Sequence, residues 1–158
     1  MPEPREAEAE ERRRFIADLQ ALASLGLSLD ELADPDLRSA VIRREHPDLE
    51  RALREGRSEV DVGGEPVNAR LHLLMHEIVA TQLVDDDPPE VWQTVCRLLD
   101  AGYDREEILH MIAAPLADQI WATLNEERPY DRQRHLAALA ALPGSWERQR
   151  ADGPAPSR

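Results

Sequence analysis

The sequence predicts an all-α, single-domain bundle of about six or seven helices. Apolar residues recur at spacings of three and four along most of the chain, and residues that cap helices precede most of these stretches. Glycine or proline ends most of them. Aromatic residues make up only 4% of the chain, so the core must consist mainly of leucine, alanine, valine and isoleucine. Such a core suits close packing of helices.

Short helices are predicted for residues 11–56, after a flexible acidic segment at residues 1–10. The first helix, expected near residues 11–24, has an apolar stripe of Phe15, Leu19, Leu22 and Leu25. Ser28 then begins a capping box, S-x-x-E, and an Asp34-Pro35 pair is typical of the start of another helix. His46 precedes a proline at a helix junction, and we interpret it as a structural or exposed residue.

Residues 57–68 differ in character from the rest of the chain. Two glycines, a proline and the alternating Val60 and Val62 indicate an irregular connection or a brief hairpin. We therefore expect this segment to separate the N-terminal helices, residues 11–56, from a C-terminal helical core, residues 69–143. Together they would form one helical domain, residues 11–143.

The C-terminal core is predicted to contain four helices. Their expected ranges are 69–84, 87–101, 105–127 and 131–142. Pro115 falls inside the third of these and should kink or break it, because proline lacks an amide donor and crowds the preceding turn. Residues 144–158 are polar, with Pro, Gly and Ser near the end, and are predicted to form a disordered tail.

Composition excludes several classes of function. A net charge of −13 argues against binding to nucleic acid, which needs a basic surface. The chain contains no lysine, which excludes Schiff-base chemistry and a phosphate-binding P-loop. Its single cysteine, Cys96, excludes an internal disulfide and a thiolate zinc cluster. No apolar run is long enough to span a membrane and no signal peptide is evident, so we expect a cytoplasmic protein.

Two histidines on one predicted helix form the first half of a candidate metal site. His72 and His76 are four residues apart, and they share a narrow helical stripe with Val79 and Leu83. Histidines at this spacing can place two imidazoles on one metal ion. The glutamate follows the second histidine as Glu77, so the pattern is not the H-E-x-x-H motif of metalloproteases.

The second half of the candidate site lies on a later helix. Glu107 and His110 form a Glu-x-x-His pair, the spacing found in carboxylate-bridged di-iron bundles. If the two helices pack together, the ligands His72, His76, Glu107 and His110 could bind zinc, iron or manganese. Asp118 or Glu106 could then act as an auxiliary acid or base.

Other interpretations of these residues stay open. Glu107 follows Asp104 by three residues and could simply complete a capping box. The histidines and the glutamate could instead form a buried polar network that fixes the register of the helices. His135 is expected to face solvent, although it could serve as a fourth ligand.

Several separated blocks resemble a known bacterial family. The runs are N-A-R-L-H-L-L-M-H-E-I-V-A-T-Q-L, then D-D-P-P-E-V, then R-L-L-D-A-G-Y-D-R-E-E-I-L-H-M-I, with H-P-D-L-E-R-A-L upstream. Over roughly residues 40–125 they resemble the family known as domain of unknown function 1841. The resemblance implies a helical fold but no particular activity. It also implies family histidines at His72, His76 and His110 and a family glutamine at Gln82. The family often has a further histidine where this chain has Glu106, so a carboxylate would replace an imidazole there.

Two functional hypotheses follow. In the first, the chain is a metal-binding helical protein, with a hydrolase or a redox enzyme as the kinds of activity that the site would allow. In the second, it is a non-enzymatic interaction module, in which the same residues form the polar network and the acidic N-terminal helix docks on a protein partner. Assembly into a homo-oligomer is compatible with both. The sequence identifies neither a substrate nor a reaction.

Overall fold

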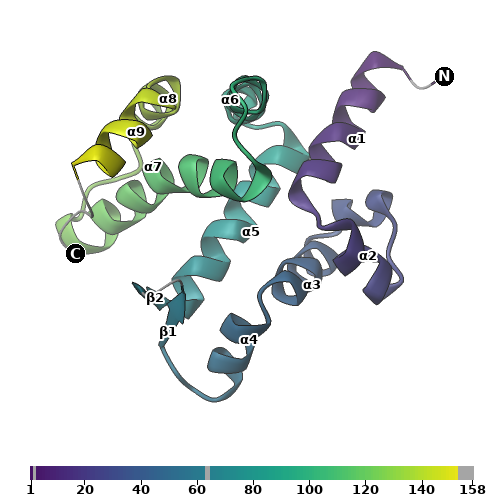
Figure 1. The fold of residues 1–158 in the computed structure, drawn as a ribbon, viewed down its shortest axis with the longest axis horizontal. Coiled ribbons are helices and arrows are strands. Elements are labelled where there is room, and N and C mark those ends of the chain that lie inside the picture. The colour runs from purple at the N-terminus through teal and green to yellow at the C-terminus, as the bar shows by residue number, and fades with distance from the viewer. Residues whose placement is uncertain (2, 63–64, 153–158) are drawn as a thin grey trace. The chain divides into compact units, whose positions relative to one another are not determined.

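The predicted all-α class is confirmed by a computed structural model, which describes residues 1, 3–62 and 65–152. The helices are α1 (Pro4–Ile16), α2 (Leu19–Leu25), the 3₁₀ helix η1 (Leu29–Ala33), α3 (Pro35–Glu45), α4 (Pro47–Arg54), α5 (Ala69–Asp85), α6 (Pro89–Asp100), α7 (Arg105–Glu126), α8 (Arg132–Ala140) and α9 (Gly144–Ala151). The strands are β1 (Glu59–Val62) and β2 (Glu65–Asn68). Figure 1 shows these elements along the chain. Contacts divide them into a first unit, residues 1–87, and a second unit, residues 88–158.

The predicted helix starts depend on local capping, and the structure shows the expected hydrogen bonds. The side chain of Asn68 accepts a hydrogen bond from the amide of Leu71 at the start of α5. Ser28 and Glu31 form the expected capping box of η1. Gly26, which ends α2, has a φ of 67°, a left-handed conformation that glycine adopts without steric cost.

The N-terminal region contains two helices where one was predicted near residues 11–24. Ala17 is extended, and the side chain of Asp18 accepts a hydrogen bond from the amide of Gln20, so a new helix begins at that point. Residues 4–10, expected to be flexible or loosely helical, form the beginning of α1. Glu3 and Glu6 cap this helix reciprocally, with a proline in its first turn.

The segment at residues 57–68 forms a brief hairpin, one of the two predicted alternatives. Strands β1 and β2 pair antiparallel, with Val60 opposite Val67 and Glu59 opposite Asn68. Because Asn68 also caps α5, the hairpin leads directly into that helix. Residues 63 and 64, part of the same predicted segment, lie outside the described residues.

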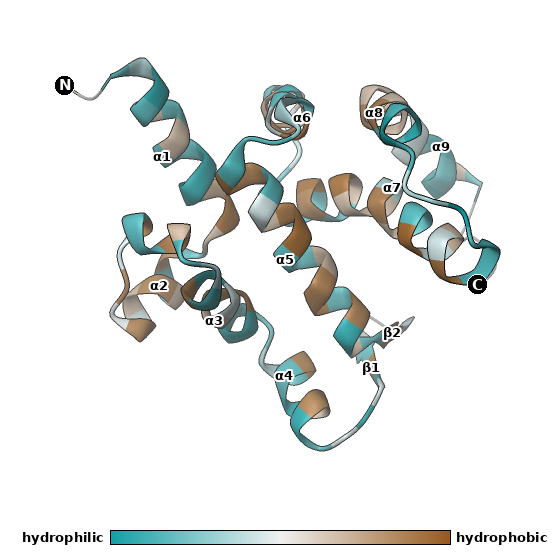
Figure 2. Cartoon of the chain, turned by 180° about the vertical axis from the view of Figure 1, so that it is seen from behind, coloured by the Kyte–Doolittle hydropathy of each residue, from teal (hydrophilic) through white to brown (hydrophobic). Residues whose placement is uncertain are grey.

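In the first unit, α5 contacts α1, α3 and α4. Figure 2 shows apolar residues along α5, whereas α1 is mostly hydrophilic. The buried apolar side chains of this unit include Leu22, Leu32, Val41, Ile42, Leu49, Val79 and Leu83. Burial of these side chains supplies the main driving force for packing the helices on α5.

Two buried arginines add directional contacts to this packing. Arg12 on α1 donates a hydrogen bond of 2.8 Å from Nε to the carbonyl of Leu83. Arg38 on α3 donates to the carbonyl of Leu32 at 2.8 Å and to the hydroxyl of Thr81 on α5 at 3.0 Å. Both guanidinium groups therefore find acceptors inside the unit, as buried charged groups require.

In the second unit, α7 contacts both α6 and α8. Its buried apolar side chains include Val91, Val95, Leu98, Ile108, Met111, Ile112 and Leu139. Arg97 on α6 donates hydrogen bonds to the carbonyls of Leu139 and Leu142, at 2.9 and 3.1 Å, near the end of α8. Helix α7 continues through Pro115 without a break, so of the two predicted outcomes, a kink or a break, the break does not occur.

Residues 144–151 form α9, where the sequence predicted a disordered tail. Polar contacts with earlier parts of the second unit explain why these residues form a helix. Trp146 and Arg150 donate hydrogen bonds to Glu107 on α7, at 3.2 and 2.6 Å. Tyr103 donates a hydrogen bond to Glu147, and this bond raises the pKa of the tyrosine. Residues 153–158 of the predicted tail lie outside the described residues.

No helix in the described part of the chain is both long and apolar enough to cross a bilayer.

Candidate metal centre

His72 and His76 lie on consecutive turns of α5, as their spacing predicts. Val79 and Leu83, which continue the same stripe, are fully buried, whereas both histidines are half-buried. The Nε2 atoms of the two rings are 3.0 Å apart. A hydrogen bond at this distance requires one of the two nitrogens to carry a proton and the other to be unprotonated.

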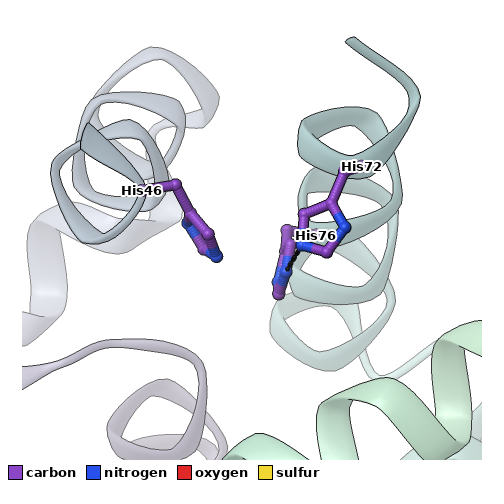
Figure 3. A group of neighbouring side chains, drawn as sticks. All are labelled: His46, His72 and His76. Carbon is purple, nitrogen blue, oxygen red and sulfur yellow. Dashed lines mark hydrogen bonds between the residues drawn. The ribbon is translucent and has the colours of Figure 1, made fainter. Parts of the chain in front are cut away.

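A third histidine, His46, joins this pair from the junction between α3 and α4. Its ring centroid lies 4.3 Å from that of His76 and 5.7 Å from that of His72. Figure 3 shows the His46 side chain pointing from its own segment toward the two rings on α5. The first unit thus brings three imidazoles together from two separate parts of the chain.

Local sequence explains the position of His46. Pro47 disfavours helical geometry at the residue before it, so α3 ends at Glu45 and α4 begins at the proline. His46 lies between the two helices, with a φ of −127° and a ψ of 63°. The helix break therefore sets the backbone from which the imidazole extends toward α5.

A backbone hydrogen bond also orients the His46 ring. Its Nδ1 lies 2.8 Å from the carbonyl oxygen of Ile42. Since a carbonyl can only accept, Nδ1 must carry the proton, and Nε2 of the neutral ring then has a lone pair. Metal-binding histidines are commonly oriented in this way by a carbonyl or carboxylate at the second ring nitrogen.

The three rings have a geometry that could hold a metal ion. One ligand nitrogen from each of His46, His72 and His76 lies within 4.8 Å of the others. Nitrogens bound to one tetrahedral zinc ion at about 2.0–2.1 Å lie about 3.3–3.4 Å apart. The 3.0 Å spacing of the α5 pair is close to that value. Binding of one ion would draw the three nitrogens, now within 4.8 Å of one another, to about that spacing.

Polar contacts between α3 and α5 hold the two sides of the cluster together. The hydroxyl of Ser39 donates a hydrogen bond to the carboxylate of Glu77, the neighbour of His76. One turn further along α5, Thr81 accepts from the guanidinium of Arg38. These contacts restrict sliding of α3 along α5 and so help to fix His46 opposite the histidine pair.

Glu107 and His110, the other predicted ligands, belong to α7 in the second unit. One carboxylate oxygen of Glu107 accepts hydrogen bonds from Trp146 and Arg150. Asp104 accepts from the amide of Glu107, as a capping residue does, but the Glu107 side chain binds α9 and completes no capping box. His110 is exposed. A metal-ligand role for Glu107 and His110 stays a prediction.

The auxiliary acids proposed from the sequence, Glu106 and Asp118, are both exposed residues of α7. His135 differs from expectation more clearly, because it is 1% exposed and does not face solvent. Its Nδ1 is hydrogen-bonded to the hydroxyl of Tyr130 at 2.7 Å. The periodicity of α8 alone could not reveal this burial, because it depends on how α8 packs on α7.

Sequence reasoning missed His46 as a member of the cluster. Its position before a proline favoured a purely structural interpretation, and the helix break does occur there. The sequence did contain a second indication of its role. The H-P-D-L-E-R-A-L block begins with His46, and it resembles the same family as the block that contains His72 and His76.

Comparison with known proteins supports the resemblance. The family model described as Domain of unknown function (DUF1841) matches residues 8–141 of the 158-residue chain. That range includes His46, His72, His76, Glu107 and His110. No curated protein and no solved structure matches the chain.

Proposed function

We propose that this chain, which belongs to the DUF1841 family, binds one divalent transition-metal ion through His46, His72 and His76. The observation that carries the proposal is the approach of three imidazoles whose ligand nitrogens lie within 4.8 Å of one another. In this proposal His46 takes the place that the sequence-based hypothesis gave to Glu107 and His110.

The orientation of His46 supports a ligand role over a purely structural one. The bond from Nδ1 to the carbonyl of Ile42 turns the ring so that it also lies against His76. The hydrogen bond keeps the lone pair on Nε2, which is the form of the ring that binds metals. An ion would therefore meet one donor that is already in the required tautomer.

The donor set favours some metals over others. Three imidazoles without a carboxylate or a thiolate suit zinc, iron, nickel or copper better than manganese or calcium, which prefer oxygen ligands. Among the metals considered from the sequence, zinc and iron are thus better candidates than manganese. Zinc is the first choice, because a tetrahedral three-histidine site is a common form of catalytic zinc centre.

A metal held by three histidines would retain a position for water or a substrate, and the half-burial of all three rings leaves the cluster accessible. Such an ion supplies Lewis acidity and lowers the pKa of a bound water. We therefore propose a metal-dependent enzyme, with a hydrolase as the first class to test. The net charge of −13 favours a neutral or cationic substrate. A cytoplasmic location and the absence of a nucleic-acid partner stay predictions.

A second candidate function rests on the hydrogen bonds of the same residues. His72 and His76 bond to each other, and His46 bonds to Ile42. Each ring thus has a partner within its own segment, and the contact between the His46 and His76 rings joins the α3–α4 junction to α5, as a structural cluster would. In that case the chain would be an interaction module and the cluster would bind no metal.

Metal uptake distinguishes the two functions. The untagged chain is incubated separately with Zn²⁺, Fe²⁺ and Mn²⁺, freed of excess ion by gel filtration and analysed for metal content. We expect close to one zinc or iron ion per chain and much less manganese. A chain that retains none of the three ions contradicts the metal site and leaves the polar network as the function of the cluster.

A further inference from the structure

A second candidate site lies between α7 and α8 of the second unit, and it is independent of the histidine cluster. Its walls contain small or cyclic apolar residues, namely Pro115, Ala122 and Ala138. Polar side chains of Asp118, Gln119, Arg134 and His135 complete the lining. This α7–α8 pocket encloses about 340 Å³, including the part that is open to solvent, which suits a ligand of only a few heavy atoms.

His135 is the buried polar group of this pocket. Its side chain is 1% exposed, and its Nδ1 is occupied by the hydroxyl of Tyr130 at 2.7 Å. Nε2 is then the ring nitrogen left to bond a ligand. Burial, and to a smaller extent the charge of Arg132, lower the pKa of His135, so the ring is neutral at pH 7. When the hydroxyl of Tyr130 donates to Nδ1, the neutral ring carries its proton on Nε2 and can donate to an anion.

The position of Tyr130 is fixed by a pair of hydrogen bonds at the neighbouring residue. The side-chain amide of Gln119 accepts from the amide of Asp131 at 3.0 Å and donates to its carbonyl at 3.1 Å. This pair connects the turn after α7 to α7 itself, next to Ala122. Because Gln119 and Tyr130 are both held, His135 meets a ligand in a preorganised orientation.

The pocket is lined by one acidic residue, Asp118, which is exposed, and one basic residue, Arg134, whereas basic residues predominate in the depression beside it. Three arginines, Arg128, Arg132 and Arg134, occur close together on the turn and the start of α8, and all line the adjoining open depression. Arg128 is paired with Glu126, and the carboxylate of Asp131 caps α8. Among the described residues, the guanidinium of Arg134 has no ion-pair partner. A positive group next to a buried imidazole donor, in a chain of net charge −13, points to an anionic ligand.

We propose that the α7–α8 pocket binds a short organic carboxylate. The carboxylate group would be bound by Arg134 and by Nε2 of His135, while the carbon chain contacts Pro115, Ala122 and Ala138. The apolar walls favour an organic acid over an inorganic anion, because phosphate has no apolar part to place against them.

The test uses the full chain labelled with ¹⁵N and NMR of its histidine rings. Sodium butyrate is titrated to about 50 mM, with sodium chloride at matched ionic strength as the reference. We expect a saturable change in the His135 ring signal with butyrate, and a several-fold weaker response to phosphate. An equal response to butyrate and chloride, or a stronger response to phosphate, overturns the proposal.

Two variants keep the test specific. Arg134→Gln should weaken butyrate binding at least fivefold, whereas Arg128→Gln, which removes the same charge from the same segment outside the pocket, should change it less than twofold. If both variants weaken butyrate binding equally, the loss reflects the overall positive charge of the segment, and the proposed site is wrong. Ala138→Leu, which fills the pocket, should abolish the response of His135. A response that persists in this variant also contradicts the site.

Discussion

The Nε2 atoms of His72 and His76 lie 3.0 Å apart on one face of α5. Two imidazole nitrogens at this distance either share a proton or bind a common ion. His46 approaches the pair from the α3–α4 junction, with its Nδ1 held by the carbonyl of Ile42. These three rings are the observation on which the proposed metal site rests.

The first prediction concerns which histidines bind metal. His46→Ala and His76→Ala should each weaken zinc binding at least tenfold, because each removes one of three proposed ligands. Mutation of a residue that only orients a metal ligand typically weakens metal binding about 10–100-fold. Tenfold is therefore a minimum for the loss of a ligand itself. Isothermal titration calorimetry with Zn²⁺ measures the change. His110→Ala is the matched control and should retain the affinity of the natural chain. A larger loss in His110→Ala than in His46→Ala would instead favour the ligand set inferred from the sequence.

The second prediction concerns coupling between metal and stability. An ion that binds only the folded chain stabilises it by about 2.7 kcal/mol when present at 100 times its Kd. Zn²⁺ should therefore raise the melting temperature of the natural chain, and the increase should disappear in His46→Ala. Differential scanning calorimetry with and without Zn²⁺ tests this. A rise of equal size in His46→Ala would mean that the stabilising ion binds elsewhere.

The third prediction concerns the buried arginine of α3. Arg38→Ala leaves the carbonyl of Leu32 and the hydroxyl of Thr81 without their donor. A buried polar group that loses its partner costs about 1–3 kcal/mol, so the free energy of unfolding should fall by roughly that amount. Urea denaturation monitored by circular dichroism provides the value. Arg14→Ala, which breaks only an exposed ion pair with Glu10, should cost less than about 0.5 kcal/mol.

The fourth prediction concerns pH and His135. Burial lowers the pKa of His135 in the folded chain, whereas the unfolded chain keeps the ordinary value of 6.5. As pH falls through 6.5, the unfolded state binds a proton that the folded state does not, so stability is lost on the acidic side. The loss stops once pH is below the folded pKa. Thermal melts between pH 7.5 and 5.0 should show a smaller decrease for His135→Gln than for the natural chain. Parallel curves would show that other groups cause the pH dependence.

The fifth prediction concerns Glu107. Its carboxylate accepts from Trp146 and from Arg150, whose side chain is largely exposed. Glu107→Ala should change the fluorescence of Trp146 and lower the free energy of unfolding by less than about 1 kcal/mol, since exposed ion pairs contribute little. Zinc affinity should stay the same. A tenfold loss of zinc affinity in this variant would restore Glu107 as a ligand.

Much of the secondary structure could be predicted because it depends on interactions between near neighbours in the chain. Asn68 and Asp104 cap their helices through amides three residues away, as expected from the sequence. The helix at residues 144–151 could not be predicted in this way. Its stabilising partners, Glu107 and Tyr103, lie much earlier in the chain.

The same distinction between local and long-range interactions applies to the candidate site. The sequence by itself determined that His72 and His76 share a face, because helical geometry places residues four apart on adjacent turns. Only the tertiary structure decided that His46 completes the cluster and that His135 is buried against Tyr130. Both facts depend on how one helix packs against another. That packing is determined by side chains from segments that are far apart in the sequence. Periodicity specifies which face of a helix is buried but leaves open which residues it meets.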